Sequence, residues 1–250
     1  MLIVQNRIAA VFLAASIASS SCHALVGESL AEGPMAPHVL MILARGHGVA
    51  GFCTGVVIAP DVVLTAAHCV ATASDTLVYV KSAEPPLMLE PRTVAKHPDY
   101  KPDALRKRER SIDLALIRTA SALPAPLRSV QLGKSEQVKI GQHFGIAGFG
   151  VTKEGQGSSA GTLRWGELRT REPLSKILLW AEDPAARGFG ACEGDSGGPV
   201  YDLQTGALVA ITSWSEGAGA QHCGKLTQAA LLAPQRAWID GVLRGWGVAR

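Results

Sequence analysis

The chain reads CEGDSGGP over residues 192–199 and LTAAHC over residues 64–69. The first stretch places Ser196 among glycines, and the second places His68 beside a cysteine. A serine hydroxyl is a weak nucleophile until a neighbouring base takes its proton, and histidine is well suited to that task. The two stretches therefore predict a hydrolytic site with Ser196 as the nucleophile and His68 as the base.

An acid that could orient the histidine opens an apolar run. Asp113 stands directly before the apolar residues 114–117. Burying a carboxylate there is costly unless it is hydrogen-bonded, and a histidine N–H would serve. Attack on a carbonyl also creates an oxyanion that needs donors. The backbone N–H groups of Gly194 and Ser196 are predicted to supply them if the chain turns sharply there.

These segments resemble those of the chymotrypsin/trypsin family of serine endopeptidases. The resemblance covers nearly the whole chain after residue 24 and extends through LVG at 25–27, KHPDY at 96–100, GFG at 148–150 and SW at 213–214. It implies an all-β fold of two packed antiparallel six-stranded β-barrels with a C-terminal helix, and a site in the cleft between the barrels. It also implies His68 as general base and then acid, Asp113 as its orienter, Ser196 as nucleophile, and no metal or cofactor.

The resemblance implies one peptidase domain over residues 25–250. We expect an N-terminal barrel at about 40–120, a C-terminal barrel at about 129–233 and a helix at about 234–245. Short apolar runs predict strands at 56–58, 62–64, 77–80, 114–117, 177–180 and 207–211. Gly-rich segments at 145–150 and 155–161 predict turns or a mobile loop. Ala237, Trp238, Ile239, Val242 and Leu243 are expected to form the apolar face of the helix.

Residues 1–24 predict a secretory signal peptide. Arg7 precedes an apolar run from Ile8 to Ile17, and small residues follow up to Ala24. The run is shorter than the roughly 20 residues of a transmembrane helix. We expect cleavage after Ala24 and a secreted protein, extracellular or periplasmic, with no membrane contact afterwards.

Four cysteines follow the expected cleavage point. In an exported chain an even number of cysteines predicts two disulfides, and four cysteines permit three pairings. The resemblance implies the pairs Cys53–Cys69 and Cys192–Cys223.

The resemblance also implies an activation pair and a substrate pocket. The freed amine of Leu25 is expected to pair with Asp195. The pocket is expected to include Gly190, Ala191, Ser213, Trp214 and Ser215. None of these pocket residues is acidic, so a buried Lys or Arg side chain would lack a counter-charge. We therefore expect a neutral residue before the cleaved bond.

The composition limits the kinds of partner that this protein is expected to bind. With 47% hydrophobic and 18% charged residues the chain is not disordered, and a net charge of +3 is too small to suggest nucleic acid. The basic cluster at 106–110 is expected to be a solvated loop. Expected partners are polypeptide substrates and protein protease inhibitors, and we expect a monomer.

Parts of this sequence pattern also fit other kinds of protein or site. The G-x-S-x-G pattern at 194–198 also occurs in α/β-hydrolases, but too little chain follows it for the rest of that fold. A metal site built from Cys53, His68, Cys69 and His97 is disfavoured because export favours pairing of the thiols. A catalytically inactive protease-like binding protein remains the alternative.

Overall fold

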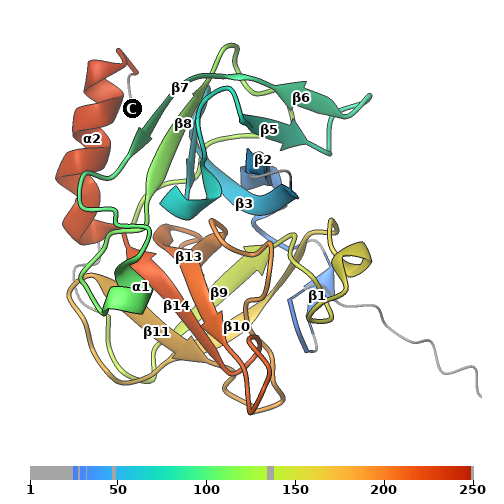
Figure 1. Cartoon of the computed structure of the whole chain (residues 1–250), viewed down its shortest axis with the longest axis vertical. Coiled ribbons are helices and arrows are strands. Elements are labelled where there is room, and N and C mark those ends of the chain that lie inside the picture. Colours follow the sequence, from blue (N-terminus) through green and yellow to red (C-terminus); the bar gives the residue numbers. More distant parts are fainter. Residues whose placement is uncertain (1–24, 28, 32, 47–48, 134–137, 249–250) are drawn as a thin grey trace, which may run out of the picture.

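Two β-sheets lie one above the other in the computed structural model, which describes residues 25–27, 29–31, 33–46, 49–133 and 138–248 (Figure 1). The expected signal peptide, residues 1–24, lies outside the described residues. One buried cluster joins Leu64 and Leu116 of the first sheet to Tyr201 of the second and to Leu243 of the terminal helix. The two sheets and the helix therefore share a core, and functional side chains from both sheets can meet at their junction.

The N-terminal sheet has seven antiparallel strands in the order β6-β5-β2-β3-β4-β8-β7. These are β2 (Val39–Gly46), β3 (Val49–Ala59), β4 (Val62–Thr65), β5 (Thr76–Val80), β6 (Leu87–Leu89), β7 (Pro91–Lys96) and β8 (Ala115–Thr119). β4 follows a Pro-Asp turn and is buried at all four positions, as a short apolar run in a sheet core should be. Its C-terminal end leads directly to His68.

The C-terminal sheet closes into a barrel. Its order is β1-β10-β11-β14-β13-β12-β9, and an additional pairing of β9 with β10 joins the ends of six strands. The strands are β1 (Leu30–Ala31), β9 (His143–Gly148), β10 (Arg164–Thr170), β11 (Leu178–Glu182), β12 (Pro199–Asp202), β13 (Leu208–Glu216) and β14 (Leu226–Leu231). The last residues of β13 are only half-buried and reach the junction of the two sheets.

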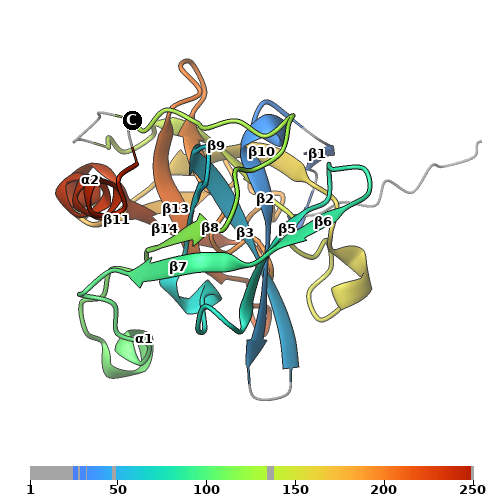
Figure 2. The ribbon, with the colours of Figure 1, turned by 90° about the horizontal axis from the view of Figure 1, so that it is seen from above.

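Two α-helices are described. α1 (Ala104–Lys107) is a single turn, and α2 (Arg236–Gly245) packs beside both sheets near the C-terminus; Figure 2 views α2 along its axis. Ile239 and Leu243 of α2 are buried, but Ala237, expected on the same face, is exposed. Within the described residues, none of the helices is both long and apolar enough to cross a membrane.

The predicted fold class, two packed β-sheets with a C-terminal helix, is confirmed, with one difference in the first sheet. Among the described pairings the N-terminal sheet is open, with β6 and β7 as its edges, whereas a closed six-stranded barrel was expected. β6 has only three residues, and β7 begins at Pro91, which has no N–H to donate.

The turn expected at 145–150 is wrong for residues 145–148, which lie in β9. A Cβ atom on Gly145 would stand 2.2 Å from the ring of Tyr201, and one on Gly148 would stand 2.2 Å from the Asp195 carboxylate. These glycines make room for neighbours across the barrel rather than for a turn. The expected solvated loop at 106–110 is indeed exposed, although its first two residues belong to α1.

Candidate active site

His68 lies in a one-turn 3₁₀ helix, Ala67–Cys69, at the end of β4. The following residue, Cys69, is joined to Cys53 on β3 by a disulfide with an S–S distance of 2.03 Å. The disulfide anchors the turn to the sheet, while the His68 side chain stays 39% exposed. The imidazole is therefore held by its backbone and remains open to a substrate.

Asp113 orients this imidazole from the start of β8. Its Oδ2 accepts a hydrogen bond from His68 Nδ1 at 2.7 Å, and its Oδ1 accepts one from the His68 backbone N–H at 3.0 Å. The hydroxyl of Ser213 donates a third bond to Oδ2 at 2.5 Å. Burial opposes ionisation of Asp113, but its hydrogen bonds with His68, the charge of His68 and the bond from Ser213 hold the pKa of the carboxyl below its ordinary value.

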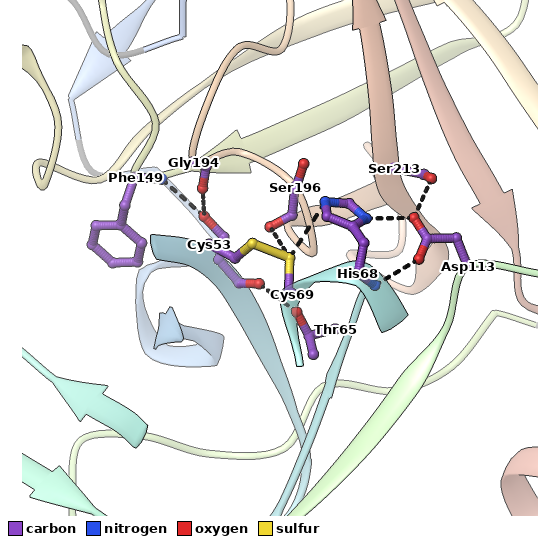
Figure 3. Close-up of a disulfide and its surroundings, with 10 residues drawn as sticks. Cys53, Thr65, His68, Cys69, Asp113, Phe149, Gly194, Ser196 and Ser213 are labelled. Atoms are coloured by element: carbon purple, nitrogen blue, oxygen red, sulfur yellow. Dashed lines mark hydrogen bonds and ion pairs between the residues drawn. A yellow bond between two sulfur atoms is a disulfide. The ribbon is translucent and has the colours of Figure 1, made fainter. Parts of the chain in front are cut away.

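An ionised carboxylate can only accept hydrogen bonds, so the proton of a neutral His68 ring lies on Nδ1. Nε2 is then left with its lone pair free. Figure 3 shows the imidazole of His68 between Asp113 and Ser196. Cys69 Sγ lies 3.7 Å from His68 Nε2 and 3.7 Å from the Ser196 carbonyl oxygen. The structure gives no hydrogen bond between Nε2 and the Ser196 hydroxyl, both in the described part of the chain; such bonds often tighten only when substrate binds.

Unpaired backbone donors lie next to Ser196. The N–H groups of Asp195, Gly197 and Gly198 donate to carbonyls at 3.0, 2.7 and 2.9 Å. Within the described residues, the N–H groups of Gly194 and Ser196 have no protein acceptor. Gly194 has a φ of +92°, and a Cβ there would stand 2.0 Å from the ring of Phe52, so only glycine fits.

Thr54 ties this loop to the N-terminal sheet, a role that the sequence did not reveal. It is fully buried, and its hydroxyl donates to the Gly194 carbonyl at 2.9 Å while accepting from Phe149 N–H at 3.1 Å. Its own N–H donates to the Ser196 carbonyl at 2.8 Å. Its position next to Cys53 was the only sequence signal, because its partners Phe149 and Gly194 are 95 and 140 residues away in the chain.

The segment 190–192 contacts both Val26, the neighbour of Leu25, and Asp195. Leu25 is fully buried in the core of the C-terminal barrel, and the carbonyl of Val26 accepts a bond from Gly190 N–H at 3.2 Å. Asp195 is also fully buried, and its two oxygens accept from Gly150 N–H at 2.8 Å and Cys192 N–H at 3.0 Å. Burial raises the pKa of Asp195 to about 7, despite these two bonds. In the uncleaved chain the nitrogen of Leu25 is an uncharged amide.

The expected pocket residues fall into two groups. Ser213 and Trp214 line a cleft of about 560 Å³ together with His68 and Asp113. Gly190 and Ala191 are buried elsewhere and do not line this cleft. Ser215 lies next to Trp214 on β13, and its hydroxyl donates to the carbonyl of His222 at 3.0 Å.

Thr227 of β14 covers the buried residues Gly190 and Ala191, and its role was not predicted from the sequence. Its hydroxyl accepts from Ala191 N–H at 3.0 Å. A Cβ atom on Gly190 would stand 3.1 Å from Gly224 Cα and 3.3 Å from Thr227 Oγ1. Gly224, directly after Cys223, and Thr227 therefore lie against Gly190.

Two of the three possible metal ligands near the site belong to a disulfide. Cys53, His68 and Cys69 place ligand atoms within 4.8 Å of one another. Both sulfurs are shared in a disulfide, however, so neither is a thiolate ligand. The second disulfide, Cys192–Cys223, joins the loop that carries Ser196 to the segment before β14. Both pairs are those that the resemblance implies.

Comparison with known proteins places this arrangement in a family. The family model for trypsin matches residues 25–239. Serine protease 56 of Mus musculus is 30% identical over 218 residues, which cover 78% of this chain, and the match spans only 35% of that relative. Trypsin Blo t 3 of Blomia tropicalis is 27% identical over 240 residues, covering 86% of this chain and 84% of the relative.

A solved structure has the same fold. Neuropsin, a serine protease expressed in the limbic system of mouse brain, matches with a TM-score of 0.69 and 24% identity over 86% of this chain and 99% of its own. That likeness concerns the fold alone, whereas the family model spans most of the sequence. The chain therefore belongs to the trypsin-like family of serine proteases.

Proposed function

We propose that this protein is a secreted serine endopeptidase that hydrolyses polypeptides through an acyl-enzyme. The observation that carries the proposal is the His68 imidazole, hydrogen-bonded to Asp113 through Nδ1 and free at Nε2 on the side of Ser196. His68, Asp113 and Ser196 come from three distant parts of the chain. A buried carboxylate that orients an exposed imidazole beside a serine is the arrangement needed to activate a hydroxyl.

The reaction has two halves, acylation of Ser196 and hydrolysis of the acyl-enzyme, and each of these groups acts once in each half. Ser196 Oγ attacks the carbonyl carbon of the peptide bond while His68 Nε2 takes the hydroxyl proton. The N–H groups of Gly194 and Ser196 hold the oxyanion that forms. The C–N bond then breaks as His68 gives its proton to the leaving amine. In the second half a water oxygen attacks the acyl carbon while His68 Nε2 takes a proton from the water. His68 then gives that proton to Ser196 Oγ as the ester bond breaks, which releases the carboxylic acid and restores the Ser196 hydroxyl.

A serine-directed covalent probe tests the proposal. We expect an organophosphonate to label Ser196 in a chain that starts at Leu25, and labelling to fall at least about 10³-fold in a His68→Ala variant, because the base is gone. Mass spectrometry of the labelled peptide checks the site. A folded protein that starts at Leu25 and is never labelled would instead support the inactive binding protein.

The primary specificity is proposed to be neutral. The polar group next to Gly190 is the uncharged hydroxyl of Thr227, which already accepts the Ala191 N–H. A cationic side chain placed there would be desolvated without a carboxylate to pair with. The close approach of Gly224 and Thr227 to Gly190 favours small side chains over aromatic ones.

We expect Thr227→Ala to shift the preference toward larger residues. Removing the Thr227 hydroxyl and methyl enlarges the space beside Gly190, so the ratio of kcat/KM for Leu over Ala before the cleaved bond should rise about tenfold. A peptide panel with Ala, Leu, Phe, Arg and Glu at that position measures it. Thr76→Ala is the matched control, because Thr76 is a buried, hydrogen-bonded threonine of the other sheet. If Arg substrates exceed neutral ones tenfold in the wild type, neutral specificity is wrong.

A further inference from the structure

The cleft of about 560 Å³ beside His68 has two chemically different walls. The wall from the C-terminal barrel is largely apolar: Ile177, Leu178 and Trp180 around β11 and Trp214 of β13 line it, with Ser213 and Gln228 as its polar members. The opposite wall comes from the segment 100–111, which includes α1 and the basic cluster at 106–110 that the sequence singled out. An apolar wall facing a charged one can distinguish the side chains of a bound peptide.

The charges on the second wall do not cancel. Lys101 Nζ pairs with Glu109 Oε2 at 2.8 Å, so these two lining residues neutralise each other. The carboxylate of Asp113 is engaged by His68 and Ser213. Within the described part of the chain, Arg108 and Arg110 have no carboxylate partner. Two positive guanidinium groups therefore remain at the cleft.

The other two basic residues of the cluster behave differently. Arg106 and Lys107 both pair with Asp103, at 3.2 and 3.7 Å, and neither lines the cleft. The cluster thus divides into a paired half away from the cleft and an unpaired half on its wall. The paired half offers a matched control for the unpaired one.

Arg108 occupies a backbone position that normally favours glycine. Its φ is +54°, and Glu109 N–H donates to the Ala104 carbonyl at 2.9 Å, which closes the C-terminal end of α1. A left-handed conformation is energetically costly for a residue with a side chain. A glycine would end this turn without that cost, so the fold keeps a strained arginine at the wall of the cleft.

We propose that this cleft binds an acidic side chain of the polypeptide substrate, two to four residues before the cleaved bond. The inference rests on the proposed function. The cleft shares Ser213 and Trp214 with the pocket expected for the residue before that bond, so it lies on the acyl side of Ser196. An extended peptide advances about 3.3 Å per residue with alternating side chains, which lets one face Trp214 and the next reach Arg108 or Arg110.

Matched peptides test the inference. One set carries Glu, Gln or Lys in turn at the second, third and fourth positions before the cleaved bond. We expect kcat/KM for Glu to exceed that for Gln by about fivefold or more at one of these positions in low salt. The difference should largely disappear near 1 M salt, where the screening length is about 3 Å. Equal rates for Glu, Gln and Lys at all three positions would overturn the inference.

Three variants locate the effect. Arg108→Gln with Arg110→Gln should remove the Glu preference, and Arg108→Glu with Arg110→Glu should turn it into a preference for Lys. The reversal is a gain of activity toward a new substrate, which a misfolded protein cannot give. Arg106→Gln should leave the preference unchanged. A Glu preference that survives both double variants would assign it to another part of the protein and contradict the proposal.

A binding measurement separates this inference from the proposed function. Fluorescence anisotropy with a Ser196→Ala variant reports the Kd of the Glu and Gln peptides without hydrolysis. Tighter binding of the Glu peptide that depends on Arg108 and Arg110 supports the cleft even if the wild type proves inactive. Hydrolysis by the wild type with equal Kd and equal kcat/KM for both peptides would refute the cleft and leave the peptidase standing.

Discussion

Replacing Asp113 with Asn will lower kcat about 10⁴-fold while leaving the protein folded. Asn keeps the shape of the carboxyl, and its remaining oxygen can still accept the His68 backbone N–H now held at 3.0 Å. Its NH₂ group, however, replaces the oxygen that now accepts from Nδ1 at 2.7 Å. Nδ1 must then become an acceptor, so the ring proton moves to Nε2, which can no longer take the proton of Ser196. Steady-state kinetics on a good peptide substrate measures the loss.

Ser213→Ala is the matched control for Asp113→Asn. It removes one of the three hydrogen bonds to Asp113 but leaves the carboxylate and the ring tautomer in place. Loss of one bond to a charged group corresponds to about tenfold in kcat, far less than the loss expected for Asn. Unfolding midpoints in urea check that both variants are folded. A fall of less than tenfold for Asp113→Asn would contradict the proposed role of Asp113.

Much of the fold could be predicted because its strands are locally encoded. The apolar runs at 56–58, 62–64 and 77–80 lie within β3, β4 and β5, and turn residues follow β3 and β5. β9 was missed because its glycines were interpreted as turn signals. Their reason is tertiary: the rings and carboxylate that occupy the missing side-chain space come from Tyr201 and Asp195, about 50 residues further on.

The residues of the site likewise include some that the sequence could predict and some that it could not. His68, Asp113 and Ser196 could be singled out because the chemistry demands a base, an acid and a nucleophile. Thr54 and Thr227 could not, because a threonine in a strand gives no local sign of function. Their roles follow from what the other sheet or the neighbouring loop brings to them, the Gly194 carbonyl in one case and the Ala191 N–H in the other. The free guanidinium groups of Arg108 and Arg110 likewise depend on which basic residues Asp103 and Glu109 neutralise.

A chain that begins at Leu25 will cleave peptides about 10²–10³-fold faster than the full 250-residue chain. In the full chain the Leu25 nitrogen is an amide, and among the described residues the buried Asp195 carboxyl has only the N–H groups of Gly150 and Cys192 as donors. A freed amine beside the segment 190–192 would pair with that carboxylate and fix the loop that carries Gly194 and Ser196. Removing one partner of a buried ion pair costs about 3–5 kcal/mol, or about 10²–10⁴ in rate. The raised pKa of Asp195 lets its carboxyl avoid part of that cost by binding a proton, so we expect the lower part of this range.

The stability of the two chains should depend differently on pH. In the full chain the pKa of Asp195 is about 7 when folded against 3.8 ordinarily, so the unfolded chain releases its proton first. The stability of the full chain therefore falls as pH rises from about 4 to 7. In the chain that begins at Leu25, the charged amine lowers the pKa of Asp195 and removes this fall. Its activity should instead decline above about pH 8, as the amine loses its proton.

Three measurements together test whether the charged amine of Leu25 shapes the loop around Ser196. N-terminal sequencing of the exported protein should read Leu-Val-Gly, and a start at any other residue removes the activation pair as proposed. Urea unfolding at about pH 5 and about pH 7 compares the stabilities of the two chains. Acetylation of the Leu25 amine is the matched control, because it removes the charge and adds only two carbons. An acetylated chain as active as the free one would show that the charge of Leu25 does not shape the loop around Ser196.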